Sequence, residues 1–189
     1  MQRILIPSID EDQLPAELRQ LAKTGALVNV FRIMLASPHI ALPVVKLGAA
    51  QFGSGALPPV DRELAILATA SCFDAAYEIS QHEQISASVG VTAAQRAAVA
   101  VRRWDSPDLS PSQQALLRFL AAAASAPTVP DAIFDEVQHH YSEQQIIEAV
   151  ILLGYYFMLA RVATVFDVPQ DPPAGDTVLR AGIALNAGS

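Results

Sequence analysis

The sequence predicts an all-helical protein, and three observations support that fold class. Hydrophobic residues make up 52% of the 189-residue chain and aromatic residues only 6%, so the apolar share comes mainly from the Ala, Val, Leu and Ile of close-packed helices. Most intervals between prolines, glycines and other stops have helical length and period. No window alternates apolar and polar residues with β-branched enrichment, so no strand of consequence is expected.

The first half of the chain predicts five helices, bounded by Pro, Gly and Ser. Pro15 suits a first helical turn and Gly25 a C-terminal cap, and Asp61 is expected to cap the helix that starts at Arg62. The expected ranges are 15–24, 28–36, 39–52, 62–71 and about 73–90.

Three capping boxes predict helix starts in the second half. Each pairs a Ser or Thr with a Gln three residues later, so that side chain and backbone satisfy each other's unpaired donors. The pairs are Thr92 with Gln95, Ser110 with Gln113, and Ser142 with Gln145. They open helices near 93–103, 111–124 and 143–166, and a further helix is expected near 131–141.

A chain of this length buries about two-thirds of its unfolded surface, so we expect one domain over residues 1–189. Its core is expected at about 25–169. The segment 170–189 is rich in Pro and Gly and is predicted to be an extended or partly frayed C-terminal arm.

Charge and cysteine content exclude several classes of protein. The net charge of −7 repels phosphate backbones, so nucleic acid is not an expected partner. Cys72 is the only cysteine, which excludes an intramolecular disulfide and a thiolate zinc or iron–sulfur site from one chain. The N-terminus lacks a signal-peptide core, and the apolar run 149–160 is too short to span a bilayer and reads as a buried core helix. We therefore expect a cytoplasmic protein with no membrane partner.

The stretch from Asp61 to Gly90 carries the candidate chemistry. Glu78 and His82 lie four residues apart and share a helix face, and a short turn returns Glu63 of the preceding helix toward them. A carboxylate beside an imidazole fixes its tautomer and raises its basicity, as general acid–base catalysis requires. The alternatives are a solvated surface pair and a metal site. Two ligands rarely suffice for a metal and no third is evident, so none is expected.

The motifs Arg62-Glu63-Leu64 and Tyr77-Glu78 with His82, followed by Gly90, resemble the signature of the carboxymuconolactone decarboxylase and alkylhydroperoxidase D-like family. The last helix, up to about residue 169, also looks like that family's closing helix. The resemblance implies a multi-helical orthogonal bundle with a site between the Glu63 and His82 helices. It further implies a small-molecule substrate, no cofactor, and a homotrimer or homohexamer whose interface completes the site.

The chain departs from the peroxidase branch of this family at two positions. Ala75 and Glu78 stand where that branch has its Cys-x-x-Cys pair, so thiol peroxidase chemistry cannot follow the family route. Cys72 is interpreted as a buried small hydrophobe rather than a reactive thiol. Tyr77, Cys72 and Arg161 are the candidate substrate-binding residues, and Arg161 suits a substrate carboxylate. Tyr155, Tyr156 and Phe157 are interpreted as helix core or oligomer contact.

Our leading hypothesis is a lyase of aromatic-compound catabolism that decarboxylates or isomerises a lactone or related organic acid. His82 is its expected general acid or base, and Glu63 and Glu78 orient it. Two alternatives remain. One is a peroxidase-like redox protein that uses Cys72 alone with an external thiol, and the other is a non-catalytic oligomeric binding protein.

Overall fold

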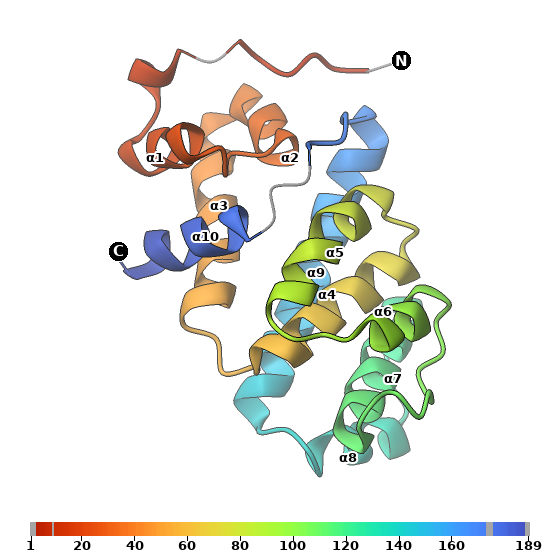
Figure 1. The fold of residues 1–189 in the computed structure, drawn as a ribbon. Helices are drawn as coiled ribbons and strands as arrows, with labels where there is room; N and C mark the ends of the chain where they lie inside the picture. The colour runs from red at the N-terminus through yellow and green to blue at the C-terminus, as the bar shows by residue number, and fades with distance from the viewer. Residues whose placement is uncertain (1–2, 9, 173–175, 188–189) are drawn as a thin grey trace. The chain divides into compact units, whose positions relative to one another are not determined.

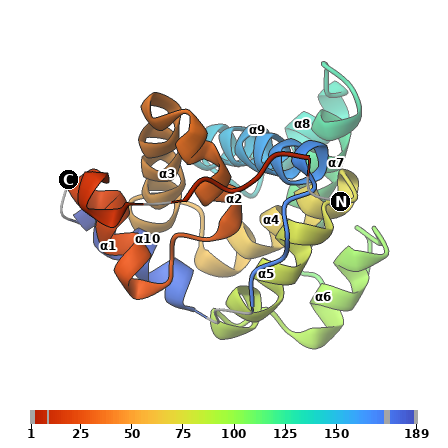
Figure 2. The same cartoon turned by 90° about the horizontal axis from the view of Figure 1, so that it is seen from above.

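The computed structural model describes residues 3–8, 10–172 and 176–187, and these contain ten α-helices, two short 3-10 helices and no strand. The predicted all-α class is therefore confirmed. The chain forms two compact units, residues 1–55 with 161–189 and residues 56–160, whose boundary falls within helix α9 (Glu143–Phe166). The helices of each unit can be followed in Figure 1 and, from above, in Figure 2.

The described part of the first unit consists of helical elements near the N-terminus, the end of α9 and one helix near the C-terminus. α1 ends at Gly25, which adopts a φ of 75° that favours glycine. The predicted ranges 15–24, 28–36 and 39–52 correspond to helices within two residues at each end, the second as an α-helix continued by a 3-10 turn. The elements are η1 (Glu11–Gln13), α1 (Ala16–Thr24), α2 (Asn29–Arg32), η2 (Ile33–Ala36), α3 (Pro38–Gly53) and α10 (Thr177–Ala187).

The predicted C-terminal arm is wrong for residues 177–187, which form α10. Ala181 and Leu185 pack against a core that includes Leu21 and Val45, and α10 contacts both α3 and α1. A Cβ on Gly53 would meet the Asn186 side chain at 2.6–2.9 Å, so glycine permits the close approach of α3 and α10. The prolines lie before α10, and tertiary packing stabilises the helix that follows them. Residues 173–175 and 188–189 of the expected arm lie outside the described residues.

The second unit surrounds α4. Every residue from Arg62 to Ser71 is buried, and α4 packs against α5, α6 and α7. Its core also includes Val99, Leu109 and Leu117, with Trp104 against their edge. The helices are α4 (Pro59–Cys72), α5 (Ala76–Ser88), α6 (Ala93–Ala100), α7 (Pro111–Ser125), α8 (Asp131–Gln138) and the part of α9 up to residue 160.

All three predicted capping boxes are present. The Thr92 and Ser110 boxes are complete, and Ser142 and Gln145 exchange the same two hydrogen bonds. The prediction that Asp61 is an N-cap is wrong, because α4 begins at Pro59 and places Asp61 in its first turn. The Asp61 carboxylate instead accepts from Gln113 at 3.1 Å and from the Tyr141 hydroxyl at 3.0 Å, which connects α4 to α7 and to the segment between α8 and α9.

The run 149–160 was expected to be a buried core helix, and the structure buries one face of it and leaves the other exposed. Leu152, Tyr156 and Leu159 are buried, whereas Val150 and Phe157 are exposed. By length and composition alone this 24-residue helix is long and apolar enough to cross a membrane, and 44% of its most apolar window is buried. A core helix of a soluble protein meets the same two criteria.

Candidate active site

The turn between α4 and α5 sets how these two helices cross. Asp74 adopts a φ of 52°, a left-handed conformation that Asp tolerates better than most residues. Arg102 also adopts a left-handed conformation, with a φ of 56°. Its guanidinium donates hydrogen bonds to the Asp74 carboxylate, at 2.5 Å, and to the Ser71 carbonyl. The turn is thereby fastened to the loop after α6, and α5 folds back along α4.

This crossing brings Glu63 of α4 to His82 of α5. Glu63 is fully buried, and its Oε2 lies 2.8 Å from Nδ1 of His82, which is 6% exposed. The Nε of Arg62 lies 3.9 Å from the other oxygen of Glu63. The predicted approach of Glu63 to His82 is confirmed. Two opposite charges at this burial act on each other far more strongly than a surface pair would.

The second ring nitrogen of His82 contacts a residue that the sequence interpretation assigned to the helix core. The hydroxyl of Tyr156, on α9, lies 3.1 Å from Nε2, and the two rings meet edge to face with centroids 5.1 Å apart. With Glu63 ionised, Nδ1–H donates to the carboxylate, and Nε2 accepts from the Tyr156 hydroxyl. Glu63, His82 and Tyr156 thus form a continuous buried hydrogen-bonded chain across three helices.

Glu78 adds a second buried carboxyl group, one helical turn before His82. Burial raises the pKa of Glu78 to about 7, and the charge of His82 acts in the opposite direction. The two carboxyl groups of the cluster therefore have different environments. Glu63 has an imidazole partner, whereas desolvation is the main cause of the raised pKa of Glu78. Such a difference is a common basis for dividing acid and base roles between two residues.

Two tyrosine hydroxyl groups complete the cluster. Burial raises the pKa of Tyr156 well above its ordinary value, and burial together with the charge of Glu78 also raises the pKa of Tyr155. Their rings pack edge to face with centroids 5.4 Å apart. Both phenols therefore stay protonated and can act as hydrogen-bond donors.

The three candidate substrate-binding residues belong to three different helices, α5, α4 and α9. Tyr77 is buried on α5, and Cys72 is half-buried at the end of α4, where burial raises the pKa of its thiol. Arg161 is exposed and belongs to the other unit. Glu63, Glu78 and His82 are brought together, whereas the binding roles of these other residues stay predictions.

Sequence reasoning missed Tyr156, Tyr155 and Arg62. The sequence did contain one indication for the two tyrosines, because a Tyr in an aliphatic helix carries a hydroxyl that needs a partner when it is buried. Nothing local to α9 indicates that the partner of Tyr156 is His82, 74 residues earlier. Among the described residues, no group of three or more His, Cys, Asp or Glu side chains is arranged to hold a metal ion.

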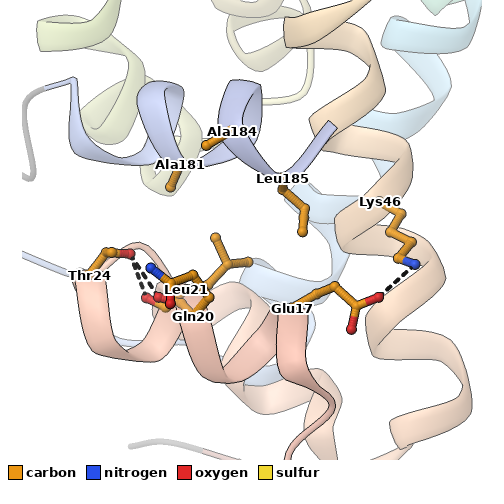
Figure 3. A pocket seen from close by; sticks show the side chains of 8 residues that line it. All are labelled: Glu17, Gln20, Leu21, Thr24, Lys46, Ala181, Ala184 and Leu185. Atoms are coloured by element: carbon orange, nitrogen blue, oxygen red, sulfur yellow. Dashed lines mark hydrogen bonds and ion pairs between the residues drawn. The ribbon is translucent and has the colours of Figure 1, made fainter. Parts of the chain in front are cut away.

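The first unit contains a separate pocket of about 260 Å³. Glu17 and Lys46 pair across its rim at 2.8 Å, and Leu21 and Leu185 supply apolar walls (Figure 3). The Thr24 hydroxyl donates to backbone carbonyls of its own helix. The charged groups of this pocket thus pair with each other, and none of the predicted site residues lines it.

Comparison with protein families matches residues 38–125 to the carboxymuconolactone decarboxylase family. This range is narrower than the expected 25–169 but contains Glu63, Glu78 and His82. No curated protein sequence matches the chain.

Solved structures with the same fold extend over nearly the whole chain. An alkylhydroperoxidase AhpD core protein from Ralstonia eutropha JMP134, described as peroxidase-related, has a TM-score of 0.76 at 21% identity and covers 96% of each chain. The debrominase Bmp8 in complex with 2,3,4-tribromopyrrole has the same TM-score and identity and covers 97% of each chain. A peroxidase-related protein from Silicibacter sp. TM1040 has a TM-score of 0.76 at 17% identity, with coverage of 90% of this chain and 92% of that one.

At these identities the solved structures establish the fold alone. The family match covers the two helices, α4 and α5, that carry the sequence motifs. The segment 38–125, which contains the candidate site, is similar to the carboxymuconolactone decarboxylase family, and the chain has the all-helical fold of alkylhydroperoxidase D-like proteins.

Proposed function

We propose that the protein is a small-molecule lyase that decarboxylates or isomerises a lactone or related organic acid by general acid–base catalysis. The observation that carries this proposal is the buried 2.8 Å contact between Glu63 and His82. A carboxylate at Nδ1 holds the imidazole in one tautomer and stabilises its protonated form. The charge of His82 partly offsets the burial that raises the pKa of Glu78, so the two groups act on each other electrostatically.

The proposed decarboxylation balances without an oxidant or reductant. The bond between the substrate carbon and its carboxylate breaks, carbon dioxide leaves, and the electron pair stays on the remaining carbon and its conjugated carbonyl. That carbon then takes one proton. When His82 enters this step protonated, Nε2–H donates to the Tyr156 hydroxyl, which delivers its own proton to the carbon and takes the Nε2 proton in return; the neutral imidazole then regains a proton from solvent. The reaction transfers no net electrons, so it requires no redox cofactor.

The comparisons support a small cyclic substrate. The family that matches the motif-bearing helices is named for a carboxymuconolactone, and the debrominase that shares the fold binds a substituted pyrrole. We further propose a cytoplasmic homo-oligomer, a homotrimer or homohexamer, that acts in aromatic-compound catabolism. Arg161, Tyr77 and Cys72 remain the proposed substrate contacts.

A peroxidase-like redox protein is the second candidate function, and the peroxidase-related descriptions of two solved structures favour it. It would depend on Cys72, whose raised pKa lowers the thiolate fraction. An external thiol would have to resolve the oxidised sulfur, since the chain has no second cysteine. The third candidate, an oligomeric binding protein, predicts ligand binding without turnover.

The proposal is tested with purified protein and carboxymuconolactone, followed by ultraviolet absorbance and release of carbon dioxide. Glu63→Gln should lower kcat because the neutral amide cannot stabilise the imidazolium. The matched control is Glu83→Gln, since Glu83 lies next to His82 in sequence but is exposed and pairs with Arg96 at 2.9 Å. Equal rates for the two variants would remove the proposed role of the Glu63–His82 pair.

A further inference from the structure

Oε1 of Glu78 and the hydroxyl of Tyr155 are buried atoms of the cluster without a hydrogen-bond partner in the described chain, as is Oε1 of Glu63, which lies 3.9 Å from Nε of Arg62. The residues Glu78 and Tyr155 are only 3% and 4% exposed. Buried polar groups are normally paired, so an unpaired carboxyl and an unpaired phenol in one cluster indicate that an outside group completes them. The proton path through His82 and Tyr156 uses neither of them.

The two groups belong to the same site. Tyr155 packs against Tyr156, whose ring packs against His82, and Glu78 lies one turn before His82 on α5. The charge of Glu78 contributes to the raised pKa of Tyr155, so the two groups act on each other electrostatically. With the pKa of Glu78 at about 7, its neutral acid can donate a hydrogen bond below neutral pH, as can the phenol.

We propose that the Tyr155 hydroxyl and the neutral Glu78 carboxylic acid form an oxyanion-binding pair that donates two hydrogen bonds to an enolate oxygen of the substrate. Donors aimed at developing negative charge in a dry site act much more strongly than the same donors in water. The inference rests on the proposed function, because bond cleavage there leaves an electron pair conjugated to a carbonyl. It narrows the substrate class to acids or lactones in which the bond that breaks is conjugated to a carbonyl group.

The surrounding charges favour this assignment. On α4, Arg62 supplies a buried positive charge and Glu63 a negative one that His82 and Arg62 both approach. On α9, the Tyr156 hydroxyl is engaged with His82. An ionised Glu78 would repel an enolate, so oxyanion binding requires its neutral form and should weaken as pH rises through about 7.

The test uses 2,4-dinitrophenolate, an anion that stays ionised across the pH range and carries delocalised negative charge on oxygen like an enolate. Its binding to the full chain is titrated by absorbance and calorimetry at about pH 6 and about pH 8. We expect about tenfold weaker binding to the wild type at the higher pH. Tyr155→Phe should weaken binding by about tenfold at the lower pH, because one charge-assisted hydrogen bond is lost.

Glu78→Gln supplies the decisive comparison, since an amide donates a hydrogen bond but does not titrate. This variant should bind the probe equally at both pH values and more tightly than the wild type at the higher one. Tyr141→Phe is the matched control: Tyr141 is a buried tyrosine of the same unit whose hydroxyl donates to Asp61, and its loss should leave probe binding unchanged.

The oxyanion pair would be overturned if the wild type does not bind the probe. It would also be overturned if Tyr155→Phe and Glu78→Gln both bind the probe with the wild-type affinity at both pH values. The pH comparison in Glu78→Gln keeps the test decisive even if Tyr155→Phe fails to fold. Because the assay measures binding without turnover, its failure leaves the role of His82 standing. Conversely, turnover that is independent of His82 would overturn the proposed function and not the binding pair.

Discussion

The hydroxyl of Tyr156 lies 3.1 Å from Nε2 of His82, while Glu63 holds the other ring nitrogen at 2.8 Å. The imidazole is therefore fixed at both nitrogens by residues from two different helices, α4 and α9. A ring held in this way has one defined tautomer and one defined direction for proton movement, toward the phenol.

Tyr156→Phe should destabilise the fold by about 1–3 kcal/mol, because Nε2 of His82 is left as a buried acceptor without its donor. Urea denaturation followed by circular dichroism measures the change. The exposed Glu83→Gln serves as the control and should stay within about 0.5 kcal/mol of the wild type. Wild-type stability in Tyr156→Phe would show that the hydroxyl does not bond to the imidazole.

Stability should fall as pH rises from about 4.5 to about 7, in the part that Glu78 contributes. Its pKa is raised from an ordinary 4.5 to about 7, so the folded state binds more protons than the unfolded state in this window. The loss is at most about 3 kcal/mol across the window. Urea denaturation at several pH values measures it, and Glu78→Gln should flatten the difference. Equal pH dependence in variant and wild type would contradict the burial of an ionisable Glu78.

Peroxidase activity should be negligible, because Ala75 and Glu78 occupy the positions of the family's two redox sulfurs and burial raises the pKa of Cys72. Peroxide consumption with a dithiol reductant measures it. Robust turnover that survives Cys72→Ser would show that the chemistry is different from either candidate. Turnover that Cys72→Ser abolishes would favour the redox function instead.

The exposed apolar face of α9 should be an interface between copies of the chain. Ile147, Val150, Ile151 and Phe157 are exposed on the same helix, and soluble proteins seldom leave such a stripe uncovered. Ile151→Glu should shift the mass toward the monomer in light scattering. Val101→Glu is the control, because Val101 is exposed but lies outside α9. A monomeric wild type at micromolar concentration would contradict the prediction.

The sequence predicted the elements whose signals are local. The capping residues at Thr92, Ser110 and Ser142 fixed three helix starts, because a cap involves only the first turn of its helix. The approach of Glu63 to His82 was also predictable, since it requires only a short turn and a four-residue spacing. Its full burial was not, because burial depends on helices distant in the chain.

The errors share one physical cause, which is contact between distant segments. α10 packs its Leu185 and Ala181 against the core beside α3 and α1, a contact that the sequence of this segment alone does not reveal. Tyr156 was assigned to the core because a buried aromatic on an apolar helix usually is core. Its contact with His82 depends on how α9 packs beside α5, which no local pattern in α9 indicates.

The central claim is that His82 moves the proton, and His82→Gln tests it most directly. Glutamine can still donate a hydrogen bond to Glu63, so the buried carboxylate keeps a partner, but it has no titratable nitrogen. Circular dichroism and urea denaturation establish that the variant is folded, and kcat for carboxymuconolactone is then compared with that of the wild type. The account predicts a loss of about a hundredfold to ten-thousandfold. A folded His82→Gln protein that turns over substrate at the wild-type rate would contradict it.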